Sequence, residues 1–257
     1  MKVVATYNIK GGVGKTSAAV NLAHLCARDG NRTLLWDLDP QGAATYIFRA
    51  HARVKGGGRG LVTGRRPLAD AVKATEFEGL DLLPADFSYR NLDLELDDGK
   101  KRTRRLGQLL AGLRRDYDVV FLDCPPSISL MSENVLHAAD TLLVPLIPAT
   151  LSVRTFDQLQ EFVAGSDKPR PDLVAFFSMV DRRKRLHREV IENIPRDRTR
   201  VATTEIPALS IVEQMAERKA PVTAFAPTSR AAGCYEQLWT EVRPAGGPRS
   251  APAARTA

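Results

Sequence analysis

The chain has 257 residues, of which 44% are hydrophobic and 26% charged, an ordinary globular composition that is sufficient for one large α/β domain. Its formal net charge of +7 favours a polyanionic partner but does not by itself separate nucleic-acid-binding proteins from other basic proteins. The three cysteines lie far apart with no CxxC pair, which argues against a zinc site or a disulfide framework and favours a reducing cytosol. Strand-like sequence directly after Met1 predicts no signal peptide, and the apolar residues 142–151 are too few to span a bilayer.

Short apolar runs alternate with helix-length amphipathic segments along the chain, which is typical of βαβ units. The sequence therefore predicts the α/β class, with a mostly parallel β-sheet covered by helices on both faces. Strands are expected at residues 2–7, 33–38, 80–83, 119–124, 141–146, 173–180 and 201–206. Helices are expected at residues 15–29, 67–74, 103–115, 129–138, 153–164, 187–194, 211–219 and 230–242.

Two segments have the composition of irregular structure. Residues 49–66 carry five glycines among basic residues and are expected to form a surface loop. Residues 244–257 are rich in Pro, Ala and Gly and lack bulky apolar side chains, so we expect a disordered tail after a single domain that covers residues 1–243.

A glycine-rich segment, Lys10-Gly11-Gly12-Val13-Gly14-Lys15-Thr16, lies between the first expected strand and the first expected helix. Such a turn lets backbone N–H groups and the helix N-terminus surround phosphates. Lys15 would reach the β- and γ-phosphates, and the Thr16 hydroxyl would bind Mg²⁺. The strict P-loop pattern requires Gly where this chain has Ile9, so the match fails at one position. The candidate nucleotide-binding residues of this segment are Lys10, Gly11, Gly12, Val13, Gly14, Lys15, Thr16 and Ser17.

Three aspartates end expected strands, at the edge where open α/β sheets bind ligands. Asp123 follows an apolar strand and is the candidate Walker B acid, holding Mg²⁺ directly or through water. Asp37 and Asp39 close another strand and, two residues apart, lie on the same side of it. One of them could orient or deprotonate an attacking water; the alternative is that each caps a turn.

The glycine-rich segment, Asp37-Leu38-Asp39-Pro40-Gln41-Gly42 and Asp123-Cys124-Pro125-Pro126-Ser127 occur here in the same order as in one known family. Together they resemble the ParA-type partition ATPases, the Soj/MinD branch of P-loop NTPases, which are SIMIBI-type proteins with a deviant Walker A motif. The resemblance covers roughly residues 1–242.

The resemblance implies roles for particular residues. Lys10 would be the signature lysine that reaches the partner's phosphates across an ATP-sandwiched homodimer. Asp39 would act on the attacking water, Asp37 would assist the Mg²⁺ shell, and Asp123 would open the second switch segment. Lys10, Lys15 and Asp39 are thus the expected catalytic residues, and Thr16, Asp37 and Asp123 the expected Mg²⁺ residues.

The resemblance also implies a reaction cycle. ATP-bound dimers would bind nonspecific DNA, and a ParB-like protein or cargo adaptor would stimulate slow hydrolysis and release them. Such a cycle positions plasmids, chromosomes or protein cargoes. The expected location is therefore cytoplasmic and nucleoid-associated.

One region departs from the family pattern. Many relatives carry an Ile-Pro-Arg-Asn-x-Arg segment and then a Glu-Ala-Pro turn near the adenine, whereas this chain has Ile206-Pro207-Ala208-Leu209-Ser210-Ile211 and then Gln214-Met215-Ala216. Met215 is therefore the candidate base contact. Because two family arginines are absent, the DNA-binding charge is expected elsewhere, on Arg182, Arg183, Arg185, Arg218 and Lys219.

Other functions are weighed against this one. A MinD-like membrane-associated ATPase would need an amphipathic C-terminal helix, which residues 244–257 do not encode. A cytosolic regulatory ATPase that binds no DNA stays open. An iron–sulfur reductase would need paired cysteines near the nucleotide, and only Cys124 lies there. An amidotransferase would need a glutaminase domain, for which we expect no room.

Overall fold

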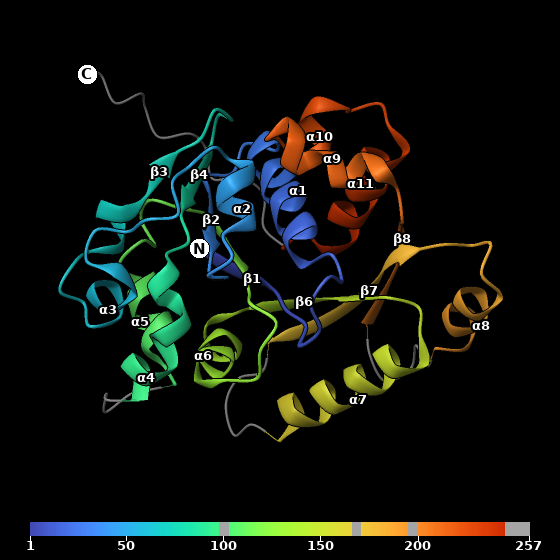
Figure 1. Ribbon diagram of the computed structural model, residues 1–257, viewed down its shortest axis with the longest axis horizontal. Helices are drawn as coiled ribbons and strands as arrows, with labels where there is room; N and C mark the ends of the chain where they lie inside the picture. Colours follow the sequence, from blue (N-terminus) through green and yellow to red (C-terminus); the bar gives the residue numbers. More distant parts are fainter. Residues whose placement is uncertain (98–102, 166–170, 195–199, 245–257) are drawn as a thin grey trace.

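The computed structural model describes residues 1–97, 103–165, 171–194 and 200–244, and Figure 1 shows a central β-sheet between two layers of helices. The sheet has the strand order β3-β4-β2-β5-β1-β6-β7-β8. The strand bounds are β1 Lys2–Thr6, β2 Thr33–Asp37, β3 Lys73–Ala74, β4 Leu80–Leu83, β5 Val119–Asp123, β6 Thr141–Leu146, β7 Asp172–Val180 and β8 Arg200–Pro207. The short edge strand β3 runs antiparallel to β4, and the other neighbouring pairs are parallel.

Consecutive residues of the central strands are buried on opposite faces of the sheet. In β5, Val120 and Leu122 belong to one hydrophobic core, whereas Phe121, between them, belongs to the other. Leu34 and Leu35 of β2 divide between the two cores in the same way. Both faces are therefore covered, which explains why these strands are apolar at every position instead of alternating. The predicted α/β class with a mostly parallel sheet is confirmed.

Two sets of helices cover the two faces of the sheet. One core contains residues of α1 and α11, and the other contains residues of α5, α6 and α7; the two sets lie on opposite sides of the sheet in Figure 1. The α-helix bounds are α1 Lys15–Arg28, α2 Ala43–Ile47, α3 Gly57–Val62, α4 Leu92–Asp97, α5 Arg105–Ala111, α6 Leu130–Ala138, α7 Thr150–Ala164, α8 Arg185–Asn193, α9 Ser210–Arg218, α10 Val222–Phe225 and α11 Arg230–Val242. Two 3₁₀ helices are η1 Leu68–Ala71 and η2 Phe87–Asn91.

The helix expected at residues 67–74 is wrong. Only η1 forms there, and the chain then extends into β3, where Lys73 pairs with Leu82 of β4. The hairpin is closed by Thr75, whose hydroxyl donates to the Leu80 carbonyl at 2.6 Å. Pairing with the sheet edge satisfies backbone groups that a helix would otherwise satisfy internally.

The surface loop expected at residues 49–66 is also wrong, because α3 forms within it. Gly56 and Gly57 adopt φ values of 88° and 62°, which turn the chain into the helix. A Cβ on Gly58 would lie 2.7 Å from the Leu92 side chain, so this glycine permits close packing. Leu61 and Val62 are buried in the core. Composition alone predicts a surface loop, whereas the glycines serve packing and turns.

Two further sequence predictions concern the rest of the chain. No helix among the described residues is long and apolar enough to cross a membrane. Apart from residue 244, the expected disordered tail lies outside the described residues.

Candidate nucleotide-binding site

The carboxyl ends of three adjacent strands place the candidate residues together. Thr6 of β1 and Asp37 of β2 both lie beside Asp123 of β5 in the sheet register. The glycine-rich segment leaves β1 at this edge and enters α1. The topology thus brings residues from the first half of the chain to one point, as expected for a parallel sheet.

The loop between β1 and α1 is held by its own backbone and by Asn8. The Asn8 amide nitrogen donates to the Pro145 carbonyl at 2.8 Å, and its Oδ1 accepts from the Lys10 backbone N–H at 2.9 Å. Lys15 is 6% exposed, and its Nζ donates to the Lys10 carbonyl oxygen at 2.9 Å. Burial lowers the Lys15 pKa, while the nearby Asp123 opposes that shift. Sequence reasoning missed Asn8, whose only signal was its position directly before the glycine-rich segment.

Two glycines of the loop differ in whether their backbone and surroundings can accept a side chain. Gly14 has φ 93°, and a Cβ there would lie 2.6 Å from Ser178 Oγ; Gly11 has no such φ, and a Cβ there would meet no atom within 4 Å. Gly14→Ala should therefore lower the free energy of unfolding by about 1–3 kcal/mol, whereas Gly11→Ala should not lower it. Urea denaturation of both variants without nucleotide measures the difference. Equal stability of the two variants would contradict the assigned backbone.

Asp123 has a buried oxygen without a partner. The residue is fully buried, its Oδ1 lies 3.5 Å from Thr6 Oγ1, and its Oδ2 has no hydrogen-bond partner among the described residues. Burial raises the Asp123 pKa well above its usual value, the charge of Asp37 adds to the rise, and the Thr16 hydroxyl opposes it. An orphaned carboxylate oxygen close to a P-loop threonine is a fitting ligand for Mg²⁺, directly or through water.

The two other aspartates have different environments. Asp37 is fully buried, and its Oδ2 accepts hydrogen bonds from Thr45 N at 2.8 Å and Thr45 Oγ1 at 2.7 Å. Its Oδ1 accepts from Asp39 N at 3.2 Å, and burial raises the Asp37 pKa to about 6. Asp39 itself lines the pocket, where its Oδ1 accepts from Gln41 N at 2.9 Å. Asp37 Oδ1 thus holds the Asp39 backbone and Oδ2 holds Thr45 of α2, and Asp37 does not line the pocket.

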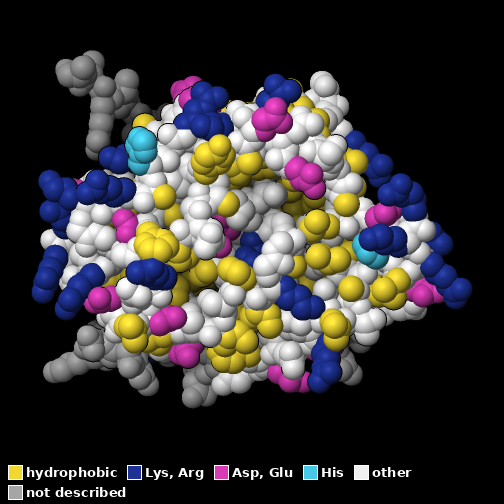
Figure 2. Space-filling view, viewed as in Figure 1, with side chains coloured by type: hydrophobic (Ala, Val, Ile, Leu, Met, Phe, Trp, Pro, Cys, Tyr) yellow, Lys and Arg dark blue, Asp and Glu magenta, His cyan; other side chains and the backbone are white. Residues whose placement is uncertain are grey.

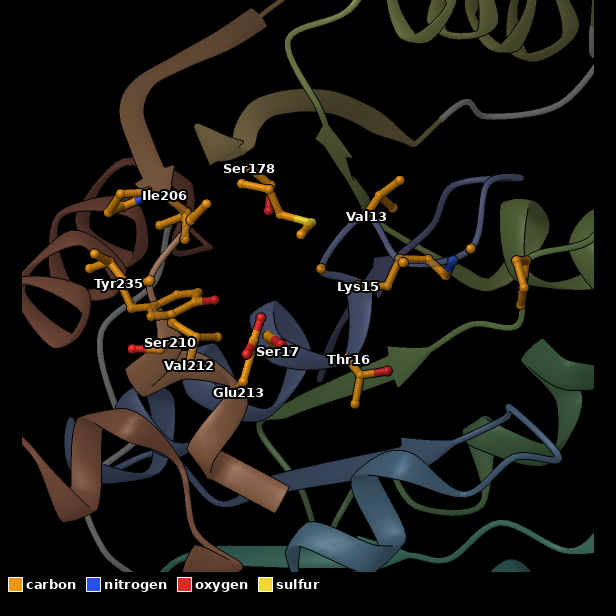
Figure 3. Close-up of a pocket in the computed structure, with 18 of the residues that line it drawn as sticks. Val13, Lys15, Thr16, Ser17, Ser178, Ile206, Ser210, Val212, Glu213 and Tyr235 are labelled. Carbon is orange, nitrogen blue, oxygen red and sulfur yellow. The ribbon is translucent and has the colours of Figure 1, made fainter. Parts of the chain in front are cut away.

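A cavity of about 430 Å³ opens beside the loop. In Figure 3, Val13, Lys15 and Thr16 lie on one side of this space, and Ser178, Ile206 and Tyr235 lie on the other. One wall is the glycine-rich loop with the start of α1. The other is formed by β7, β8, α9 and α11, through Ser178, Met179, Ile206, Pro207, Ala208, Leu209, Ser210, Val212, Glu213 and Tyr235. The mixed polar and apolar wall is suited to a nucleoside.

The structure does not place Met215 at the predicted base contact. Its side chain is 2% exposed and is absent from the pocket lining, and its Sδ accepts from Asn21 Nδ2 at 3.3 Å. Position 215 lies on the face of α9 that packs toward α1, whereas Val212 and Glu213, two or three residues earlier, line the cavity. Helical periodicity explains why the contact predicted by family position fails.

Three of the four arginines predicted to contact DNA are exposed but paired with acidic side chains. Arg182, Arg183 and Arg185 each donate to an acidic side chain, Arg182 Nε to Glu205 at 2.8 Å, Arg183 Nε to Asp181 at 2.9 Å and Arg185 Nε to Glu189 at 2.6 Å. Lys219 Nζ lies 4.8 Å from the Tyr46 ring centroid, and Arg218 is exposed nearby on α9. These residues form two separate groups, and each carboxylate reduces the positive charge presented to solvent at residues 182–185.

Comparisons with known proteins agree with this geometry. The family model described as "AAA domain" matches residues 1–173. The sporulation initiation inhibitor protein Soj of Bacillus subtilis is 33% identical over 94% of this chain and 98% of its own length. The chromosome partitioning protein ParA of Caulobacter vibrioides is 35% identical over 76% of this chain and 75% of its own.

A solved structure shares the whole fold. The crystal structure of cobyrinic acid a,c-diamide synthase from Mycobacterium smegmatis, with bound ATP analog and magnesium, superposes with a TM-score of 0.80. It is 28% identical, and the match covers 93% of each chain. This similarity supports nucleotide and magnesium as the ligands that suit the fold.

Proposed function

Because the chain belongs to the ParA/MinD family of P-loop ATPases, we propose that it is an ATP-hydrolysing dimerisation switch. In its ATP state it binds nonspecific DNA, and a ParB-like or cargo-adaptor protein stimulates hydrolysis. The switch thereby positions or segregates a plasmid, a chromosome or a protein cargo. The observation that supports this proposal is that Lys15 and Thr16 line the cavity, while the buried Asp123, with one unpartnered carboxylate oxygen, interacts with both of them.

Each residue contributes a distinct step. Lys15 exchanges its bond to the Lys10 carbonyl for the β- and γ-phosphates, and loop N–H groups surround those phosphates. Thr16 and Asp123 would hold Mg²⁺, which, when bound, neutralises phosphate charge. Asp39 orients the attacking water, and Asp37 fixes the Asp39 backbone. Lys10 acts on the partner subunit's nucleotide.

DNA binding tests the proposal directly. Affinity for a labelled duplex should require ATP, be indifferent to sequence and weaken steeply with salt, because Lys and Arg neutralise phosphates. If about four phosphates are contacted, log K should fall with a slope of about −3.6 against log salt. Fluorescence anisotropy at several salt concentrations, with ATP or ADP, measures this slope. A flat salt profile with ATP would end the DNA proposal and favour a cytosolic regulatory ATPase.

Two alternatives have their own discriminating observations. ATP-dependent binding to anionic vesicles without binding to duplex DNA would favour a MinD-like membrane-associated ATPase. The name of the Mycobacterium protein suggests amide synthesis, but the Caulobacter chromosome partitioning protein is more similar in sequence, at 35% against 28% identity. We therefore favour the positioning ATPase.

A further inference from the structure

The positive charge of the chain is concentrated in one segment that the proposed site does not use. Between Asp39 and Asp70 the sequence has no Asp or Glu, whereas it carries six Lys or Arg residues. The net charge of the whole chain is +7, so this short stretch holds a charge nearly equal to that of the entire protein. The six residues are Arg49, Arg53, Lys55, Arg59, Arg65 and Arg66.

The fold presents this charge outward. The apolar residues of α3 face the core, and Arg53, Lys55 and Arg65 are exposed. The segment folds back on itself, because Arg66 N donates to the Gly60 carbonyl at 3.3 Å. In Figure 2, Lys and Arg side chains gather along the side of the molecule that carries α3. The basic side chains of the segment are therefore clustered on one face of the protein.

Arg90 extends the same face. The backbone of α3 is joined to η2, since Gly58 N donates to Ser88 Oγ at 2.7 Å. The exposed Arg90 lies on η2, with its guanidinium carbon 4.1 Å from the centroid of the Phe87 ring, which is 62% exposed. We call the group Arg53, Lys55, Arg59, Arg65, Arg66 and Arg90 the α3 basic surface.

Little of this charge is neutralised by the protein. Arg59 pairs with Glu95 at 3.2 Å, but Arg53, Lys55 and Arg65 make no ion pair with any described residue. The nearby Asp86 is buried, and its carboxylate accepts from Val54 N at 2.7 Å and from Ser88. Burial raises the Asp86 pKa, but the hydrogen bonds of Ser88 and Val54, and to a smaller extent the Arg53 charge, outweigh burial and lower it. The arginines at residues 182–185 differ, since each has an acidic partner. Unpaired cations are the ones that release counterions when phosphates bind.

We propose that the α3 basic surface is a phosphate-backbone contact surface for double-stranded DNA, additional to the basic groups at residues 182–185 and 218–219. The inference rests on the proposed function. Arginine forks suit phosphate oxygens, and the Phe87 ring supports the Arg90 guanidinium at this surface. A membrane surface is disfavoured, because the apolar side chains of α3 are buried, so α3 itself has no apolar face to enter a bilayer.

The test compares two variants of the full chain that lose the same formal charge. Arg53→Ala/Lys55→Ala/Arg65→Ala removes three unpaired cations of the surface. Arg114→Ala/Arg115→Ala/Arg243→Ala removes three exposed cations from elsewhere. Anisotropy with a labelled duplex, Mg²⁺ and a slowly hydrolysed ATP analogue gives the affinity and the salt slope. ATP binding and unfolding by urea are measured on both variants to verify that each is folded.

In the first variant, the slope of log K against log salt should become less negative by about 2.7. Its affinity near 0.1 M salt should fall on the order of 100-fold. The control should keep the parent slope within one unit. If the parent binds DNA and the surface variant keeps its slope, or if both variants lose equally, the inference is overturned while the proposed function stands. If the unmutated protein binds no duplex DNA, the proposed function itself is contradicted. Loss of anionic-vesicle binding alone would assign the surface to lipid instead.

Discussion

Asp39→Ala should leave nucleotide binding close to that of the parent while lowering the rate of ATP hydrolysis by about 10²–10⁴-fold. Asp39 lines the cavity and has one carboxylate oxygen held by Gln41 N, at 2.9 Å. Its backbone N–H is fixed by the fully buried Asp37. In the proposed function this side chain acts on the attacking water and does not hold the phosphates, so nucleotide binding should persist without it. Trapping of the ATP-bound dimer should follow.

A matched control separates water activation from general disturbance of the pocket. Glu213 lines the same cavity from α9, so Glu213→Gln should alter nucleotide affinity at most and leave turnover at saturating ATP near that of the parent. Steady-state phosphate release and equilibrium binding of a fluorescent ATP analogue, measured on both variants, supply the comparison. Undiminished hydrolysis by Asp39→Ala would remove Asp39 from the reaction.

Local patterns in the sequence were sufficient for the sheet and the phosphate loop. Runs such as Val120-Phe121-Leu122 are apolar at each position because both faces of the sheet are covered, and this identifies parallel strands. The loop from Lys10 to Thr16 is recognisable because phosphate binding requires glycines and a lysine at fixed spacing, within one short segment. These features depend on neighbours in the chain.

The features that the sequence did not predict depend on distant contacts. The helix α3 forms because Gly58 packs against Leu92, more than thirty residues away. The wall opposite the phosphate loop combines β7, β8 and α9, so the exclusion of Met215 from it depends on how α9 is rotated against α1. Ion pairing of Arg182 with Glu205 likewise requires the fold. Charge counting along the chain could not distinguish paired arginines from unpaired ones.

Lys10→Ala should preserve ATP binding by the monomer and abolish ATP-dependent dimerisation, with loss of both hydrolysis and DNA binding. The Lys10 side chain is not part of the pocket lining and makes no hydrogen bond or ion pair with the described residues. Its backbone does serve the monomer, since the Lys10 carbonyl accepts from Lys15 Nζ at 2.9 Å and the Lys10 N–H donates to Asn8. Truncation to Ala keeps both backbone contacts, so the substitution isolates the ammonium group.

The expected size of the effect follows from the interface that the ammonium group would enter. A lysine that meets a triphosphate in a partly dried interface makes a charge-assisted contact, and losing one such contact costs about 2–5 kcal/mol. Lys15→Ala is the matched variant, because it should lose nucleotide affinity in the monomer from the outset. Sedimentation of both proteins with a slowly hydrolysed ATP analogue distinguishes the two lysines. If Lys10→Ala still dimerises and hydrolyses ATP as the parent does, Lys10 has no role across the interface and the dimerisation switch loses its defining residue.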